Sequence, residues 1–137
     1  MTRTRAAYRI RQNAEGIMTN TKPEQILRGL LTDLGYVIDS RQMVVLVQDE
    51  QGKEWEFRPD IQLYSSQGEI FEADGHYHDT PIQRRKTTWR DRQLSKRGFK
   101  IIHVASELLY VKKWHPDVKN AIVKAINSSV QVHHIDA

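Results

Sequence analysis

Two helix starts with a run of β-rich segments between them constrain the fold more than any other feature of the sequence. At the first start Thr21 is placed to cap a helix, proline stands in the first turn, and Glu24 occupies the capping-box position. Leucines and isoleucines then recur at helical spacing, which predicts a helix over about 22–34. The second start, Thr80 followed by proline, predicts a helix over about 81–97.

The segments between and after these helices have the pattern of strands. β-Branched and aromatic residues are concentrated there, and turns separate the segments. Pro59 removes one hydrogen-bond donor, so we expect an edge or an irregularity at that point. A last amphipathic helix begins at Pro116. Strands are expected at 36–38, 43–47, 55–64, 69–74 and 100–104. This succession predicts an α/β fold in which helices flank a central mixed β-sheet.

Length and composition are those of one soluble domain. The chain has 137 residues, of which 39% are hydrophobic, enough for one modest core. We expect a basic N-terminal arm at 1–20, a folded domain at 21–128 and a C-terminal tail at 129–137. No apolar run approaches the roughly 18 residues of a membrane helix, and the N-terminus lacks the apolar core of a secretory signal. We therefore expect no membrane partner and a cytoplasmic location. Cysteine is absent, which excludes disulfides, cysteine-based zinc fingers and thiol catalysis.

Basic residues are concentrated in two places. Lys and Arg number 21 against 17 Asp and Glu, a net charge of +4 with neutral His. Between Arg84 and Lys100 eight basic residues surround a single acid, Asp91. A phosphate backbone attracts clusters of this density, although an ordinary solvated helix face has the same pattern. The residues expected to contact nucleic acid are Arg84, Arg85, Lys86, Arg90 and Arg92 in the second helix and Arg3 and Arg5 in the arm.

Acidic residues stand at or near the ends of two consecutive predicted strands. Asp60 follows Arg58-Pro59, and after eleven further residues comes Glu72-Ala73-Asp74. An antiparallel hairpin would bring these positions side by side. Mg²⁺ takes oxygen ligands, typically one or two carboxylates with waters and phosphates, so two acids and the Ala73 carbonyl would suit it. The alternative is that these are ordinary polar positions on a half-solvated hairpin.

Two motifs give these acids a resemblance to a known family. The pattern Pro59-Asp60…Glu72-Ala73-Asp74 resembles the PD-(D/E)xK nuclease superfamily. Residues 72–78 (EADGHYH) and 90–104 (RDRQLSKRGFKIIHV) are similar to its very-short-patch-repair-endonuclease-like branch, and the similarity covers roughly 22–110. It implies a restriction-endonuclease-like, nuclease-like domain that hydrolyses DNA phosphodiester bonds, a Mg²⁺-dependent endodeoxyribonuclease in which Mn²⁺ can replace Mg²⁺. DNA is then the expected partner and DNA repair an expected context.

Carried over residue by residue, the resemblance implies roles around the metal. Asp60 would be the principal metal ligand and Glu72 the second acid of the motif. Ala73 would lend its carbonyl oxygen, and Glu24 would bind the metal through water. For Glu24 the capping box is a complete alternative explanation.

The residue that activates water is less clearly marked. His78 lies near the histidine that related repair nucleases use beside the scissile phosphate, with His76 as the alternative. The superfamily lysine position is occupied by Asp74, so water activation would fall to His78, His76, Lys86 or a second metal. Asp74 is itself a candidate ligand for such a second ion.

The motif leaves other functions open. The missing lysine slightly favours a catalytically inactive DNA-binding module of the same fold, whereas retention of both acids favours an enzyme. A structure-selective nuclease acting on junctions or nicks is a third candidate. A single site cuts one strand, so double-strand cleavage would need a homodimer or two successive nicks. Of the other polar residues, we expect Asp91 in a helix-surface ion pair, His103 as a hydrogen-bonded structural residue, and His133-His134 as part of the tail and no metal site.

Overall fold

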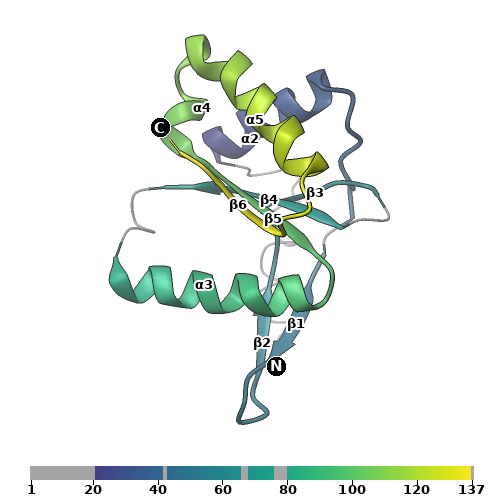
Figure 1. Cartoon of the computed structure of the whole chain (residues 1–137), viewed down its shortest axis with the longest axis vertical. Coiled ribbons are helices and arrows are strands. Elements are labelled where there is room, and N and C mark those ends of the chain that lie inside the picture. Colours follow the sequence, from purple (N-terminus) through teal and green to yellow (C-terminus); the bar gives the residue numbers. More distant parts are fainter. Residues whose placement is uncertain (1–20, 42, 66–67, 76–79, 137) are drawn as a thin grey trace, which may run out of the picture.

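A mixed four-stranded sheet lies at the centre of the molecule. The computed structural model describes residues 21–41, 43–65, 68–75 and 80–136. The strands, in their order across the sheet, are β3 (Ile61–Gln62), β4 (Glu69–Asp74), β5 (Lys100–Ala105) and β6 (Val132–Ile135). β3 is antiparallel to β4, whereas β4, β5 and β6 are parallel to one another. Helices lie on both faces of this sheet (Figure 1), which confirms the predicted α/β class.

The helices form two unequal layers. The outer faces of the sheet are covered by α3 (Pro81–Lys96) on one side and by α2 (Lys22–Asp33), α4 (Ser106–Leu109) and α5 (His115–Asn127) on the other, with the 3₁₀ turn η2 (Lys112–Trp114) before α5 (Figure 1). Both predicted helix starts are confirmed: Thr21 Oγ1 accepts the N–H of Glu24, and Thr80 Oγ1 accepts the N–H of Gln83. Within the described residues no helix has the length and apolar character needed to cross a bilayer.

Alternating side chains of β5 divide the interior into two cores. Ile102 and Val104 pack in the larger core, with Leu31 of α2 and the helices of that layer. Ile101 points the other way and packs with Leu94 of α3 and with the hairpin that precedes β3. Successive residues of a strand face opposite sides of a sheet, so an entirely buried strand needs a helix layer on each side. Each fully buried aliphatic side chain contributes about 1.5–3 kcal/mol to the free energy of unfolding.

The segment expected as one strand over 55–64 is divided between two sheets. β2 (Glu54–Phe57) pairs antiparallel with β1 (Val45–Gln48) in a separate two-stranded sheet. The break falls at Arg58-Pro59-Asp60, where proline has no N–H to donate. The irregularity expected at Pro59 is thus present, and it lets Asp60 leave the ladder just before β3 begins.

The C-terminal segment contributes to the sheet, contrary to our expectation of a tail. β6 pairs in parallel with β5, and the N–H of Ile101 donates to the carbonyl of Gln131 at 2.7 Å. Residues 132–135 are therefore part of the folded domain. The expectation of a tail is wrong there because the partner strand lies about thirty residues earlier in the chain, and such pairing leaves no local signal in the sequence.

Candidate active site

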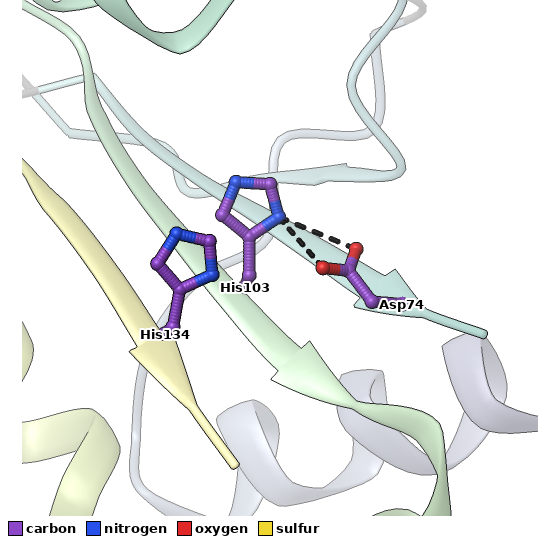
Figure 2. A group of neighbouring side chains, drawn as sticks. All are labelled: Asp74, His103 and His134. Carbon is purple, nitrogen blue, oxygen red and sulfur yellow. Dashed lines mark hydrogen bonds and ion pairs between the residues drawn. The ribbon is translucent and has the colours of Figure 1, made fainter. Parts of the chain in front are cut away.

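Polar side chains from three neighbouring strands lie on the face of the sheet that α3 covers. Glu72, His103 and His134 occupy paired register positions on β4, β5 and β6. Asp74 stands two residues after Glu72 and so shares its face. The Nδ1 atom of His103 lies 3.0 Å from Oδ2 of Asp74, and the rings of His103 and His134 stack with their centroids 4.6 Å apart (Figure 2). At this end of the sheet, the side chains between the sheet and α3 are therefore charged and polar, whereas farther along they are apolar.

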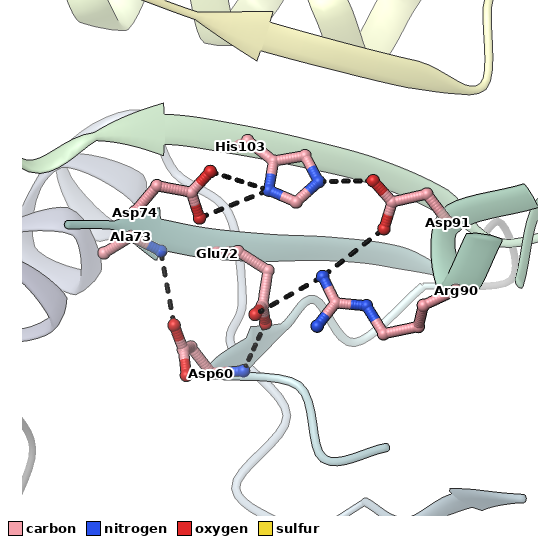
Figure 3. Close-up of polar contacts among 7 residues, drawn as sticks. All are labelled: Asp60, Glu72, Ala73, Asp74, Arg90, Asp91 and His103. Atoms are coloured by element: carbon pink, nitrogen blue, oxygen red, sulfur yellow. Dashed lines mark hydrogen bonds and ion pairs between the residues drawn. The ribbon is translucent and has the colours of Figure 1, made fainter. Parts of the chain in front are cut away.

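The two acids of the motif, Asp60 and Glu72, meet beside β4. The N–H of Asp60 donates to Oε2 of Glu72 at 2.8 Å, and the N–H of Ala73 donates to Oδ2 of Asp60 at 3.2 Å (Figure 3). Since Ile61 pairs with Phe71, Asp60 and Glu72 are the next opposed residues. The N–H and C=O groups of one strand residue point to the same side, so the carbonyl of Ala73 is directed toward Asp60 as well.

The surroundings of Glu72 disfavour its charged form. Burial, together with the negative charge of Asp60, raises the pKa of Glu72 to about 8. Arg90 offsets this only in part, because its Nη2 atom is 4.0 Å from Oε1 of Glu72 and 3.4 Å from Oδ1 of Asp91. A divalent cation shared by the carboxylates of Asp60 and Glu72 would relieve the repulsion between them. These oxygen donors fit a hard cation such as Mg²⁺.

Glu24, on α2, is linked to the backbone of Asp60 through Arg28. Its side chain is buried, with Oε2 3.8 Å from Nη2 of Arg28. The same Nη2 atom donates to the backbone carbonyl of Asp60 at 3.1 Å. Glu24 is thus the residue whose N–H is capped by Thr21, and its side chain is also linked to Asp60 through Arg28. The structure brings Asp60, Glu72 and Ala73 together, and Arg28 links Glu24 to the backbone of Asp60.

The metal-ligating side chains that converge most clearly are a different set. Asp74, His103 and His134 each offer one ligand atom, and these atoms lie within 4.8 Å of one another. Within the described ranges no such group of three includes Asp60 or Glu72. Neither histidine is expected at a metal from the sequence, because the register between β5 and β6 cannot be read from it. The alternation of side chains along 100–104 is the one signal for His103 in the sequence, because it places His103 on the opposite face of the strand from Ile102.

Asp91 is buried and bound to His103, contrary to the expected surface ion pair. Its side chain is 5% exposed, and Oδ2 lies 2.6 Å from Nε2 of His103 (Figure 3). Burial alone would lower the pKa of His103, but hydrogen bonds to Asp74 and Asp91 outweigh it and raise the pKa to about 9. At neutral pH His103 is therefore an imidazolium held between two carboxylates.

The outer surface of α3 is the candidate nucleic-acid interface. Arg84, Arg85, Lys86 and Arg92 are exposed there. Arg90 is not part of this surface, because its guanidinium lies 4.2 Å from the ring centre of Phe57 and is directed toward Glu72. A surface hollow of about 460 Å³ is lined by Pro81, Arg84, Arg85, Thr88, Trp89 and Arg92. The other residues expected at the site or the DNA, Arg3, Arg5, His76 and His78, lie outside the described residues.

The raised pKa values of Glu72 and His103 predict how the stability of the metal-free protein depends on pH. The folded protein holds the proton of Glu72 up to about pH 8 against an ordinary 4.5, so stability falls as pH rises between these values. The contribution of His103 is complete below its ordinary pKa of 6.5 and is lost as pH rises through about 9. We expect the free energy of unfolding, measured with urea in EDTA, to fall by at least about 2 kcal/mol between about pH 5 and about pH 9.

A matched variant identifies the acid part of this dependence. Glu72→Gln keeps the size of the side chain and cannot ionise, so its stability should change less than that of the parent between about pH 5 and about pH 8. A free energy of unfolding that rises over this interval in EDTA would contradict the assignment of both pKa values.

Comparison with known proteins gives no relative. No family model, no curated protein and no solved structure matches the chain. Its function is therefore inferred from its own residues, their geometry and the motif resemblance described above.

Proposed function

We propose that the protein is a divalent-metal-dependent endonuclease that hydrolyses phosphodiester bonds in DNA, on a restriction-endonuclease-like fold. The observation that carries this proposal is the meeting of Asp60 and Glu72 beside β4, with the pKa of Glu72 raised by burial and by Asp60. Charging a buried carboxyl such as Glu72 beside a second carboxylate is costly unless a cation is bound. The exposed arginines of α3 add a surface suited to a phosphate backbone.

Different residues of the chain would have different roles at this site. Asp60, Glu72 and the Ala73 carbonyl would hold Mg²⁺ or Mn²⁺, with Glu24 acting through water. The bound ion would supply acidification of a water and neutralisation of charge on the phosphate. Arg28 fixes the backbone carbonyl of Asp60 and so orients that residue. His78 remains the proposed partner for proton transfer at the scissile phosphate.

Plasmid nicking tests the proposal. Supercoiled DNA should be nicked in the presence of Mg²⁺ or Mn²⁺ and should remain intact in EDTA. Retained DNA binding without nicking in either metal would instead identify a catalytically inactive binding module, which the aspartate at the motif lysine position favours. Faster cleavage of branched or nicked DNA than of linear duplex would identify the protein as a structure-selective nuclease.

DNA binding should depend on the exposed arginines of α3 and on salt. We expect the triple variant Arg84→Ala, Arg85→Ala, Arg92→Ala to bind duplex DNA at least about tenfold more weakly at moderate salt. The slope of log K against log salt should become less negative by about 2–3, since each lost phosphate contact removes about 0.9. Fluorescence anisotropy at several salt concentrations measures both quantities.

A charge-matched triple variant on the opposite layer is the control. Lys112, Lys113 and Lys124 are exposed residues of η2 and α5. Their replacement by alanine removes the same three charges but should leave the slope nearly unchanged. Equal losses in the two triple variants would show that net charge alone, and not the surface of α3, attracts DNA.

A further inference from the structure

Three metal-ligating side chains stand in a row across β4, β5 and β6, apart from the oxygen pair at Asp60 and Glu72. Asp74 ends β4, His103 lies within β5, and His134 is the register partner of His103 on β6. Their ligand atoms fall within 4.8 Å of one another (Figure 2). Each comes from a different strand of the central sheet, so the backbone of the fold fixes their spacing.

Asp91 binds the ring nitrogen of His103 that faces away from Asp74, as metal-bound histidines require. Its Oδ2 atom lies 2.6 Å from Nε2 of His103, on the side of the ring away from Asp74 (Figure 3). Metal-bound histidines almost always donate their second ring N–H to a carboxylate or carbonyl, which fixes the tautomer. With Nε2–H donated to Asp91, Nδ1 on the Asp74 side is the nitrogen that would release its proton and bind the ion.

Two of the three side chains line a pocket that is open to solvent. A pocket of about 340 Å³ opens at the carboxyl ends of the three parallel strands, the usual position of ligand sites in such sheets. Asp74 and His134 line it, and the other charged residues of the lining are two acids, Glu107 and Asp136, and Arg84. His134 is exposed, and within the described residues its side chain makes no hydrogen bond. Its ring is therefore able to turn from the parallel stack so that a nitrogen faces the ion.

We propose that Asp74, His103 and His134 form a second metal site, selective for a transition metal of the zinc class over Mg²⁺. Two imidazole nitrogens and one carboxylate oxygen are ligands that Zn²⁺ and Co²⁺ prefer, whereas Mg²⁺ requires oxygen. Three protein ligands leave a coordination position open toward the pocket, as in catalytic rather than structural zinc sites. This site shares no ligand with the proposed cleavage site at Asp60 and Glu72.

Metal titration of the full-length protein tests the site. In buffer that contains millimolar Mg²⁺, which occupies oxygen sites, isothermal calorimetry with Zn²⁺ should show one ion per chain. The absorption spectrum of the Co²⁺ form should report nitrogen coordination with low coordination number. His134→Ala should weaken binding at least about tenfold, and Asp91→Asn about 10–100-fold.

The neighbouring histidine supplies the matched control. His133 lies on the same strand but faces the other way, and its Nε2 atom bonds the carbonyl of Val130. His133→Ala and Asp60→Asn should both leave Zn²⁺ binding unchanged, and His134→Gln should reproduce the loss if alanine perturbs the strand. Absence of one-to-one binding, or full binding in His134→Ala, would overturn the proposal. Neither result affects the nicking test of Asp60, so each of the two proposals can be refuted without the other.

Discussion

Replacement of Asp60 by asparagine is expected to reduce Mg²⁺-dependent nicking at least about 1,000-fold, equivalent to about 4 kcal/mol in the activation free energy. Asparagine keeps the size of the side chain and an oxygen that can accept the N–H of Ala73, a hydrogen bond of 3.2 Å in the parent. The fold should therefore persist. What is lost is the negative charge that would hold a divalent cation beside Glu72. Initial nicking rates with Mg²⁺ and with Mn²⁺ measure the effect.

Two further measurements separate catalysis from folding and binding. Glu50→Gln removes one negative charge from an exposed position in the turn between β1 and β2, and its nicking rate should equal that of the parent. Asp60→Asn should bind DNA at least as well as the parent, since one repulsive charge has gone. Nicking that survives in Asp60→Asn would place the catalytic metal elsewhere in the molecule and would remove the basis of the proposed function.

The parts of the fold that sequence analysis predicts are those governed by neighbouring residues. Thr21 and Thr80 cap helices because their hydroxyls reach an N–H three residues on, and the starts of α2 and α3 follow from that. The glycine after α3, Gly98, has a φ of 92°, a conformation that favours glycine and ends the helix. Pairing across the sheet obeys no such local rule, which is why β6 was not expected in it.

The same distinction applies to the site. Asp60 and Glu72 are neighbours because a short turn joins their strands, so spacing and alternation suffice to bring them together in a prediction. The contacts of His103 with Asp91 and His134 depend on how α3 and β6 dock against β5. Those contacts arise from crossovers between parallel strands, whose register a single sequence does not disclose.

Lys100 illustrates how burial changes the meaning of a charge. It belongs by sequence to the basic cluster that ends at residue 100, yet it is 8% exposed and cannot join a DNA-binding surface. Its ammonium group donates to the backbone carbonyls of Ala125 at 2.9 Å and Ile126 at 2.8 Å, and also to that of Ser128. The side chain thus binds the carbonyl end of α5 to the first residue of β5, where the helix dipole favours a cation.

Replacing Lys100 by methionine is therefore expected to lower the free energy of unfolding by about 4 kcal/mol. Methionine retains an apolar stem of similar length, so the loss isolates the ammonium group and the carbonyls it leaves without their donor. Urea unfolding followed by circular dichroism, with an unchanged slope against urea, measures it. Lys96→Met, on the exposed last turn of α3, should change stability by less than about 0.5 kcal/mol. A loss below about 1 kcal/mol in Lys100→Met would show that water replaces the ammonium at little cost, and that α5 does not depend on β5 for its C-terminal cap.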